Sequence, residues 1–281
     1  MKKKCLIYVV CYNHEKFILN TLERIPQKLN EDYDVEILVA NDKSKDKTLE
    51  ETKKFVTKSF KYNIISLYKN LGYGGNQKIG YYYSILNNFD YVVLLHGDGQ
   101  YAPEYLPDIL KKFENDKKFS AVFGSRMIEK GSALKGGMPL YKFVGNKILT
   151  FAQNFLLDVK LSEFHSGYRA YRVESLRKIF FQKNSNDYCF DTEIIIQLIL
   201  NKFKIKEISI PTFYGDEISY VNGFKYAFQI MVETLKAYLF QRNIINIKKF
   251  KTLDTQNNAE LESYNFEFKE IIENSKFFKI N

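Results

Sequence analysis

The sequence predicts an α/β fold in which a mainly parallel β-sheet carries helices on both faces. Short runs rich in β-branched and aromatic residues alternate with stretches whose apolar residues recur every three or four positions. Strands separated by helical stretches of this length are typical of parallel crossovers. The 281 residues, of which 45% are hydrophobic and 27% charged, are enough to bury a substantial core.

The first half of the chain predicts four strand and helix pairs followed by a fifth strand. The strands are expected at Cys5–Cys11, Val35–Ala40, Ile64–Tyr68, Tyr91–Leu95 and Phe119–Phe123. The helices are expected at Glu15–Leu29, Lys45–Ser59, Pro103–Phe113, and from the glycine turn NLGYGGN to Leu86.

The second half is less regular. Lys130–Pro139 holds three glycines and a proline, which suits a loop that closes over a substrate as well as a plain flexible connection. Helices at Leu140–Leu157 and Asn186–Leu200 and a strand at Lys204–Pro211 complete a domain of residues 1–215. A basic amphipathic helical segment at 216–250 and an acidic tail at 251–281, whose apolar residues suggest a docked helix, are expected to follow.

Charge and cysteine usage narrow the class of protein. The net charge of +9 favours an anionic partner, which could be nucleic acid, lipid headgroups or a phosphorylated substrate. Cys5, Cys11 and Cys189 show no paired spacing, so we expect reduced thiols and neither disulfides nor zinc. No apolar run is long enough to span a bilayer, so the expected location is cytoplasmic, or peripheral at the inner face of the membrane.

Polar or glycine-rich turns follow the first four predicted strands. They are Tyr12–Asn13, Asn41–Asp42, Gly72–Gly75 and His96–Gln100. Because the carboxyl ends of parallel strands share one edge of a sheet, we expect these turns to converge on one site. The stretch DYVVLLHGDGQY ends a buried strand in Asp98 between two glycines, which suits a metal ion and the phosphates of a nucleotide. Taken alone, Asp98 could equally cap the helix that Pro103 begins.

Six motifs in this order resemble glycosyltransferase family 2, especially its branch of dolichyl- and polyprenyl-phosphate sugar synthases. They are VVCYNHE, VANDKSKDKT, NLGYGGNQKIG, HGDGQY, GSR at Gly124–Arg126 and HSGYRAY at His165–Tyr171. The resemblance runs from Cys5 to about Tyr214. It implies a GT-A fold, a nucleotide-sugar-binding half followed by an acceptor-binding half, and transfer of a hexose with inversion.

For the donor, the resemblance implies that Tyr12 and Glu15 enclose the base of a UDP- or GDP-sugar and that Asp42 contacts the nucleoside. The remaining donor-binding candidates, from the glycine-rich turns and the helix after the third strand, are Gly74, Lys78 and Gly97. Lys78 would help to neutralise the diphosphate that leaves.

The resemblance also implies a divalent cation, Mg²⁺ or Mn²⁺. Asp98 matches the second acid of the family's DxD motif, Gln100 matches a further ligand position, and His96 replaces the first acid. A neutral imidazole suits Mn²⁺ better than Mg²⁺, and it removes one anionic ligand.

For the acceptor, the resemblance places Arg126 and Arg169 on arginines that hold a phosphate, for which the guanidinium group is well shaped, although either arginine could instead form a structural ion pair. Asp191 or Glu193 would be the catalytic base if the acceptor were a saccharide hydroxyl, whereas a phosphate needs no base. Both acids could instead simply favour the helix dipole. The two arginines favour a polyprenyl phosphate or another intermediate of cell-envelope glycan synthesis.

Two other classes of protein and two roles for the C-terminal region remain open. A dinucleotide-dependent oxidoreductase would need its glycine fingerprint after the first strand, where this chain has CYNHE. A non-catalytic anion- or membrane-binding module would not explain the converging turns, and nucleic acid is not expected as a partner. The aromatic and basic stretch Tyr220–Phe250 could lie on a membrane, or pack on the domain or on a second subunit of a homo-oligomer.

Overall fold

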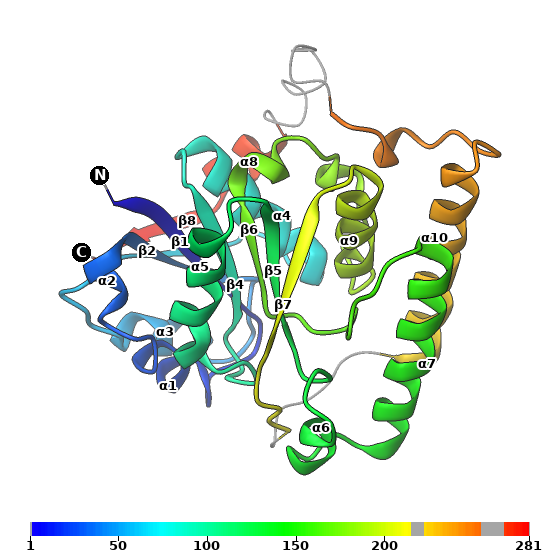
Figure 1. The fold of residues 1–281 in the computed structure, drawn as a ribbon. Coiled ribbons are helices and arrows are strands. Elements are labelled where there is room, and N and C mark those ends of the chain that lie inside the picture. Colours follow the sequence, from blue (N-terminus) through cyan, green and yellow to red (C-terminus); the bar gives the residue numbers. More distant parts are fainter. Residues whose placement is uncertain (1, 215–221, 254–266, 281) are drawn as a thin grey trace.

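The computed structural model describes residues 2–214, 222–253 and 267–280. Its strands are β1 (Lys3–Cys11), β2 (Tyr33–Asn41), β3 (Lys61–Ser66), β4 (Tyr91–His96), β5 (Phe119–Ser125), β6 (Arg169–Arg172), β7 (Lys204–Ser209) and β8 (Lys276–Lys279). These described strands form one eight-stranded sheet in the order β7-β5-β6-β4-β1-β2-β3-β8 (Figure 1). The α/β prediction is therefore confirmed.

Both parallel and antiparallel pairs occur in the sheet. Strand β1 pairs in parallel with β2 and β4, β2 with β3, and β5 with β7. The antiparallel pairs involve β6, which lies between β4 and β5, and β8, which pairs with β3. The sequence prediction missed both β6 and β8, which are four residues long and too short to show a period.

Two hydrophobic cores lie on opposite faces of the sheet, and alternate residues of β1 contribute to each. Leu6 and Tyr8 face the core under α4 (Gly72–Leu86), α8 (Val173–Leu176) and α9 (Phe190–Leu200). Cys5 and Ile7 face the core under α1 (Ile18–Glu23), α2 (Leu29–Asp32), α3 (Thr48–Lys54) and α5 (Leu106–Asn115). A sheet covered on both sides explains why its central strands are apolar throughout.

Some predicted helices were too long. The single helix expected over Glu15–Leu29 is wrong, because the chain leaves the helix at Arg24 and Pro26 cannot continue it, so α1 and α2 are separate. Helix α3 is shorter than Lys45–Ser59. The predicted glycine turn is also wrong in part, since Gly72 already begins α4. Pro103 opens a 3₁₀ turn, Pro103–Tyr105, which continues into α5.

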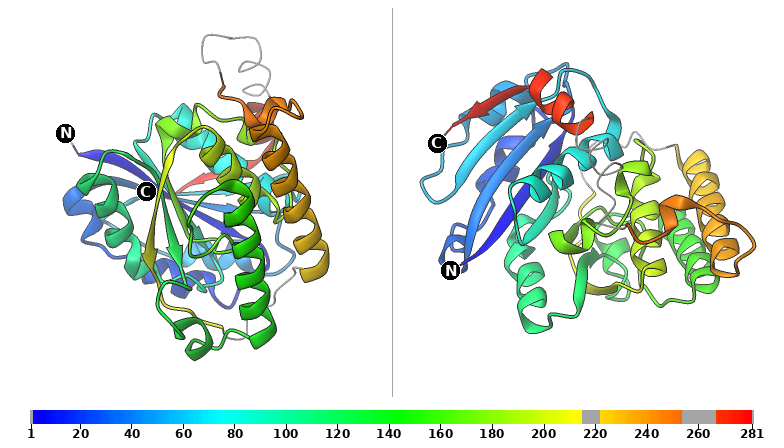
Figure 2. Two further views of the ribbon diagram at one scale, coloured as in Figure 1. Left: turned by 45° about the vertical axis from the view of Figure 1, so that its right-hand side comes forward. Right: turned by 90° about the horizontal axis from the view of Figure 1, so that it is seen from above.

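The second half of the chain adds two long helices that lie beside each other. Helix α7 (Leu140–Leu157) has the predicted bounds, and α10 (Gly223–Gln241) packs against it at the side of the molecule away from both chain ends (Figures 1 and 2). The loop before α7 contains the short helix α6 (Ser132–Lys135). In the described part of the chain, no helix is long and apolar enough to cross a membrane.

The C-terminal region returns to the sheet. After α10 come the 3₁₀ turn Lys248–Phe250, a helix at 267–274 and then β8. A docked helix in the tail was expected, and Phe268 and Ile271 of this helix are buried. The residues of the predicted tail at 254–266 lie outside the described part of the structure.

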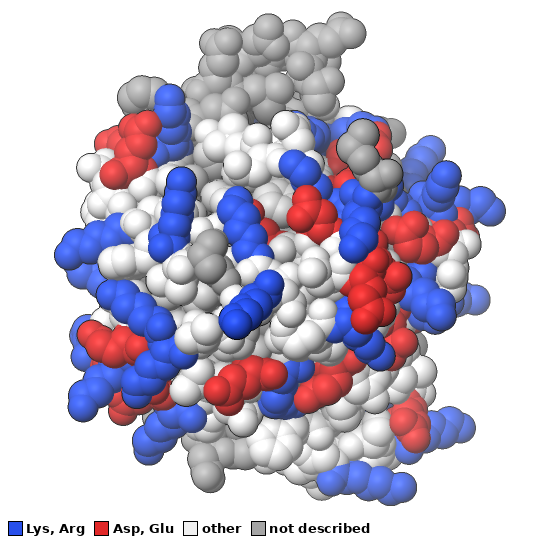
Figure 3. Space-filling view, turned by 90° about the vertical axis from the view of Figure 1, so that its left-hand side faces the viewer, with Lys and Arg blue, Asp and Glu red and all other residues white. Residues whose placement is uncertain are grey.

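Lysine and arginine side chains are scattered over the surface opposite α7 and α10 (Figure 3). That face carries Lys and Arg side chains mixed with Asp and Glu (Figure 3). Among the described residues on this face in Figure 3, no large basic patch of the kind that binds nucleic acid stands out.

Candidate functional site

A cavity of about 1040 Å³ lies where β1, β2 and β4 end. From the first half of the chain its lining includes Tyr12, Asp42, Gly72, His96, Asp98 and Gln100. From residue 126 onward it includes Arg126, Lys142, Asn146, His165, Asp191, Tyr214 and Tyr226. The turns that were predicted to converge therefore meet at one cavity, as the parallel order of β4, β1 and β2 requires.

Asp98 is the cavity carboxylate that is most open to a ligand. Its Oδ1 accepts a hydrogen bond from the backbone N–H of Gln100 at 3.0 Å, and among the described residues no ion pair involves it. Asp42 and Asp191, by contrast, each have hydrogen bonds on both carboxylate oxygens. Asp98 therefore offers an oxygen of the type that Mg²⁺ and Mn²⁺ prefer.

The donor set at Asp98 fits a cation that also takes ligands from a bound diphosphate. Among the described residues, no group of three His, Cys, Asp or Glu side chains could hold a metal ion alone. Asp98, Gln100 and His96 all line the cavity, so one carboxylate and two neutral groups face it. Such a site would bind a cation together with its nucleotide more readily than by itself.

His96 is held by aromatic neighbours. Its Nε2 lies 3.1 Å from the hydroxyl of Tyr73, and its ring packs edge-on against the rings of Tyr73 and Tyr101. Burial lowers the pKa of His96, although Asp98 and Asp191 oppose that shift. The side chain therefore enters the site as a neutral imidazole.

The two acids of α9 lie in different places. Asp191 lines the cavity, where its Oδ2 accepts from Tyr73 at 2.9 Å and its Oδ1 accepts from Gln77 at 3.0 Å. Glu193 is buried away from the cavity lining, and it pairs with Lys249 at 2.7 Å. Glu193 also accepts hydrogen bonds from Ser185, so its role here is to fix the end of the chain after α10 onto α9.

Both predicted phosphate-binding arginines are buried and have partners within the protein. Arg126 lines the cavity, but its guanidinium forms an ion pair with Glu163 and donates to the carbonyl of His165 at 3.0 Å. Arg169 is not part of the cavity lining and donates to three backbone carbonyls, among them that of Asp191 at 2.6 Å. Arg169 is therefore placed to hold α9 and Asp191 in position.

Two of the three predicted contacts to the nucleoside line the cavity, and the third does not. Asp42 and Tyr12 line the cavity, and Asp42 accepts from the backbone N–H groups of Leu71 and Gly72 at the start of α4. Burial raises the pKa of Asp42 to about 6, although these two N–H groups lower it. Glu15 is not in the lining, and its carboxylate accepts from the backbone of Lys47 at 2.9 Å.

Gly74, Gly97 and Lys78 lie behind the cavity wall. A Cβ at Gly74 would come within 2.6 Å of the carbonyl oxygen of Ser185, and one at Gly97 within 2.9 Å of the Cβ of Cys11. Lys78 donates to Asn184 and Asn186, and burial lowers its pKa to about 8. All three residues hold neighbouring segments close together and do not face the cavity.

Several residues of the site were not predicted from the sequence, including Tyr73 and the pair of His165 and Tyr226. The Nδ1 atom of His165 lies 3.0 Å from the hydroxyl of Tyr226, while its Nε2 is buried without a partner in the described structure. Burial lowers the pKa of His165 to about 4. His165 and Tyr73 lie within two of the six family motifs, so the sequence could have indicated both residues as part of the site. Tyr226 lies 61 positions beyond His165 and outside these motifs, so no sequence pattern indicated it.

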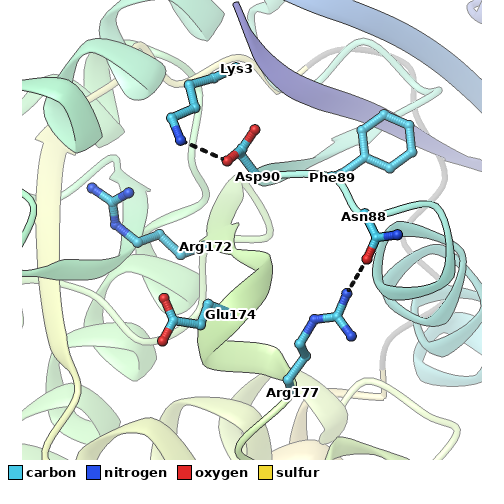
Figure 4. A pocket seen from close by; sticks show the side chains of 7 residues that line it. All are labelled: Lys3, Asn88, Phe89, Asp90, Arg172, Glu174 and Arg177. Atoms are coloured by element: carbon cyan, nitrogen blue, oxygen red, sulfur yellow. Dashed lines mark hydrogen bonds and ion pairs between the residues drawn. The ribbon is translucent and has the colours of Figure 1, made fainter. Parts of the chain in front are cut away.

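A second, smaller pocket lies at the opposite ends of β1 and β4 (Figure 4). Lys3 pairs there with Asp90 at 3.0 Å, and Arg177 donates to Asn88 at 3.0 Å. Arg172 donates to the carbonyls of Phe113 and Phe119. Because these cations already have partners, we assign no ligand to this pocket.

Comparison with known proteins supports the same family as the motifs. A relative from Methanococcus voltae, UDP-N-acetylglucosamine–dolichyl-phosphate N-acetylglucosaminyltransferase, is 30% identical over 75% of this chain and 87% of its own length. Undecaprenyl-phosphate mannosyltransferase of Micrococcus luteus is 25% identical over 76% of this chain and 85% of its own.

Solved structures show the same fold at lower sequence identity. Glucosyl-3-phosphoglycerate synthase of Mycobacterium tuberculosis, crystallised with Mn²⁺, UDP and glucosyl-3-phosphoglycerate, matches with a TM-score of 0.60 and 14% identity. The match covers 84% of this chain and 80% of that one. The family model described as "Glycosyl transferase family 2" matches residues 6–180, and the chain belongs to this family of glycosyltransferases.

Proposed function

We propose that the protein transfers a sugar, with inversion, from a nucleotide-sugar to a lipid phosphate of the polyprenyl or dolichyl type. In this reaction an oxygen of the acceptor phosphate forms a bond to the anomeric carbon of the sugar. The bond from that carbon to the nucleoside diphosphate breaks, and the diphosphate leaves with the electron pair. The observation that carries the proposal is a cavity that combines donor-type ligands with an exposed apolar face at its mouth.

The donor would bind on the first half of the cavity. Tyr12 and Asp42 are the proposed contacts to the nucleoside, since both line the cavity at the ends of β1 and β2. The relative from Methanococcus voltae is named for a UDP-sugar, and the Mycobacterium tuberculosis structure contains UDP, which supports UDP as the first nucleotide to test.

A divalent cation would sit at Asp98, with Gln100 and His96 as further ligands. When bound, it would neutralise the charge that develops on the diphosphate as the bond between the diphosphate and the sugar breaks. The Mn²⁺ in the Mycobacterium tuberculosis structure supports this part of the proposal.

The acceptor phosphate would bind on the second half of the cavity, near Arg126 and Lys142. Arg169 would act through Asp191, because its guanidinium donors are used by backbone carbonyls. Both carboxylate oxygens of Asp191 already accept hydrogen bonds, and Arg169 lies 3.6 Å from Oδ2, so the carboxylate is engaged within the protein. This favours a phosphate acceptor, which is already an anionic nucleophile, over a hydroxyl that must be deprotonated.

The lipid chain of the acceptor would lie against the exposed apolar side chains of α7 and α10, which we call the α7–α10 face. Its residues are Leu140, Tyr141, Val144, Ile148, Phe151, Phe155, Phe224, Phe228 and Leu235. Phe155 is 78% exposed and Phe224 is 94% exposed, although large apolar side chains are usually buried. Tyr141 and Phe224 also line the cavity, so the face is continuous with the proposed acceptor site.

The charges beside this face suit an anionic membrane surface. Lys142 and Lys147 are the charged residues of α7, which has no acid. Apolar side chains next to lysines bind an interface through burial and through attraction to anionic lipids. We therefore propose that the protein works at the inner face of the membrane, with the α7–α10 face against the lipid.

The test is a donor and acceptor screen with purified protein. UDP- and GDP-sugars would be combined with polyprenyl phosphate in vesicles or with free saccharides, and nucleotide release and glycolipid product would be measured. We expect product with the lipid phosphate and about a tenfold or greater loss of its formation for Arg126→Ala. Arg177→Ala, in the second pocket, is the control and should keep the wild-type rate. Transfer to saccharides but not to lipid phosphate, with loss of rate in Asp191→Asn, would replace this proposal with the hydroxyl mechanism.

Membrane contact is tested separately by sedimentation with vesicles that contain anionic lipid. The double variant Phe151→Ser, Phe155→Ser should sediment less than the wild type, because it removes two exposed apolar anchors. Val56→Ser changes an apolar residue that is 80% exposed outside the face and is the matched control. Equal sedimentation of all three proteins would exclude the α7–α10 face as the contact.

A further inference from the structure

The hydroxyl of Tyr73 joins His96 to Asp191, and only one arrangement of protons satisfies both contacts. The Tyr73 oxygen lies 2.9 Å from Oδ2 of Asp191 and 3.1 Å from Nε2 of His96. A phenol has one proton to donate, so Tyr73 can be the donor in only one of these two hydrogen bonds.

The proton of Tyr73 belongs to the contact with Asp191. Gln77 donates to Oδ1 of Asp191 at 3.0 Å, and the guanidinium of Arg169 lies 3.6 Å from Oδ2. Tyr73 donates to Oδ2 of this carboxylate in the same way that Gln77 donates to Oδ1, so the single proton of the phenol is used there. The Tyr73 oxygen must then accept from His96, and Nε2 of His96 must carry the proton.

The ring of His96 is fixed in this orientation. Its edge contacts with Tyr73 and Tyr101 have centroid distances of 5.5 and 4.9 Å. The backbone of Gly167 lies against its other side, since a Cβ at Gly167 would come within 2.6 Å of the Cε1 atom of His96. The hydrogen bond that the described structure gives His96 uses Nε2 and leaves Nδ1 without a partner.

We propose that Tyr73 and Asp191 hold His96 in the Nε2–H tautomer, so that Nδ1 presents a lone pair to the divalent cation bound by Asp98. This inference rests on the cation site of the proposed function. His96 is two residues from Asp98 and lines the same cavity. Tyr73 is then a positioning residue, which acts on the cation through the tautomer of His96.

Two consequences distinguish this site from a pair of acids. A neutral nitrogen ligand favours Mn²⁺ over Mg²⁺, which prefers oxygen. The geometry of the cation site also depends on Asp191 and Arg169, which belong to the second half of the chain. A substitution of Asp191 should therefore change the tautomer of His96 as well as the binding of the acceptor.

The tautomer can be measured directly by ¹⁵N NMR of the histidine rings in the whole protein without nucleotide. The chain has three histidines, so three sets of ring signals are expected. His96 should show a protonated Nε2 and an unprotonated Nδ1, and Tyr73→Phe should produce a mixture of tautomers. Tyr83→Phe is the matched control, because Tyr83 is on the same helix and also donates to a carboxylate, that of Glu36 at 2.6 Å.

Cation binding is measured on the same proteins by the electron paramagnetic resonance of free Mn²⁺ in the presence of UDP. We expect about tenfold weaker Mn²⁺ binding for Tyr73→Phe and unchanged binding for Tyr83→Phe. His96→Asp should shift the preference toward Mg²⁺. In the wild type, bound Mn²⁺ should broaden the His96 ring signals more than those of the other histidines.

The outcomes separate this inference from the proposed function. An Nδ1–H tautomer in the wild type would overturn the arrangement of protons. The expected tautomer without selective broadening of His96 by Mn²⁺ would overturn ligation of the cation by His96. If both NMR results are as expected and no sugar is transferred from any donor, the inference stands and the proposed function fails.

Discussion

Arg126 and Glu163 form a buried ion pair in which the carboxylate accepts from the backbone N–H of Arg126 at 2.8 Å and from its Nε at 3.0 Å. Asn146 of α7 donates to the same carboxylate at 2.8 Å. Burial alone would raise the pKa of Glu163, but the guanidinium of Arg126 holds it below its usual value. The pair therefore fixes one wall of the cavity to α7.

Replacing Glu163 by Gln should lower the free energy of unfolding by about 3–5 kcal/mol, because the charge of Arg126 would then be buried without a counterion. Urea denaturation measures the change. Glu174→Gln is the control, since Glu174 pairs with Lys178 on the surface, and it should cost less than about 1 kcal/mol. Equal effects of the two substitutions would contradict the assignment.

Asp98→Asn should lower the rate of sugar transfer by about a hundredfold or more, because the proposed cation, which would stabilise the departing diphosphate, would lose its anionic ligand. Initial rates at saturating donor give the comparison. Asp90→Asn is the matched control, because Asp90 precedes β4 and lies at the end of the strand opposite Asp98. Wild-type activity of Asp98→Asn would remove Asp98 from the cation site.

The affinity for UDP should fall as the pH decreases below about 6, because burial raises the pKa of Asp42 to about 6 and the ionised carboxylate is the better acceptor for nucleoside hydroxyls. Below that pH, the loss should approach about tenfold per pH unit if binding needs the ionised form. Calorimetric titration with UDP across this range measures it. Asp42→Asn should bind UDP more weakly and with no such pH dependence, and an unchanged profile would exclude Asp42 as the group that titrates.

The raised pKa of Asp42 also makes the free energy of unfolding depend on pH. The folded protein takes up a proton at Asp42 more readily than the unfolded chain, whose Asp has a pKa of 3.8. The contribution of Asp42 to stability is therefore full below about pH 3.8 and is lost as the pH rises through about 6.

Two glycines within helices should respond to alanine in opposite directions. Gly74→Ala should destabilise the fold by about 1–3 kcal/mol, because its Cβ would collide with Ser185 and Phe190. Gly145→Ala should stabilise it by about 1 kcal/mol, because nothing lies within 4 Å of the added Cβ and alanine favours the helix. Thermal unfolding compares the two, and destabilisation by both would contradict the open space at Gly145.

The sequence predicted the parallel strands and the place of the cavity because both follow from local patterns. Runs of apolar residues predicted the central strands. Because the carboxyl ends of parallel strands lie at one edge of a sheet, the turns that follow these strands were predicted to meet there. The bounds of α7 were also predicted correctly, since its apolar residues keep a helical period. Pro26 could have indicated the break between α1 and α2.

The partners of buried charges could not be predicted, because they come from distant parts of the chain. Asp191 and Glu193 are two positions apart on a helix, so their side chains point in different directions. Only the fold shows that Glu193 pairs with Lys249 and that Asp191 accepts a hydrogen bond from Tyr73. Arg169 matches a phosphate contact in a family motif. Its guanidinium instead donates to three backbone carbonyls, and tertiary packing brings these carbonyls to it. Strand β8 pairs with β3, more than 200 positions earlier in the chain.

The outermost strands of the sheet also bear on how the protein behaves at high concentration. Strand β8 carries exposed Lys276 and Lys279 at its two ends, and β7 on the far side carries exposed Lys204 and Lys206. An unprotected outer strand invites a strand from another molecule, and lysines there make that addition unfavourable. Both outer strands of the described sheet are therefore protected against the addition of a strand from another molecule.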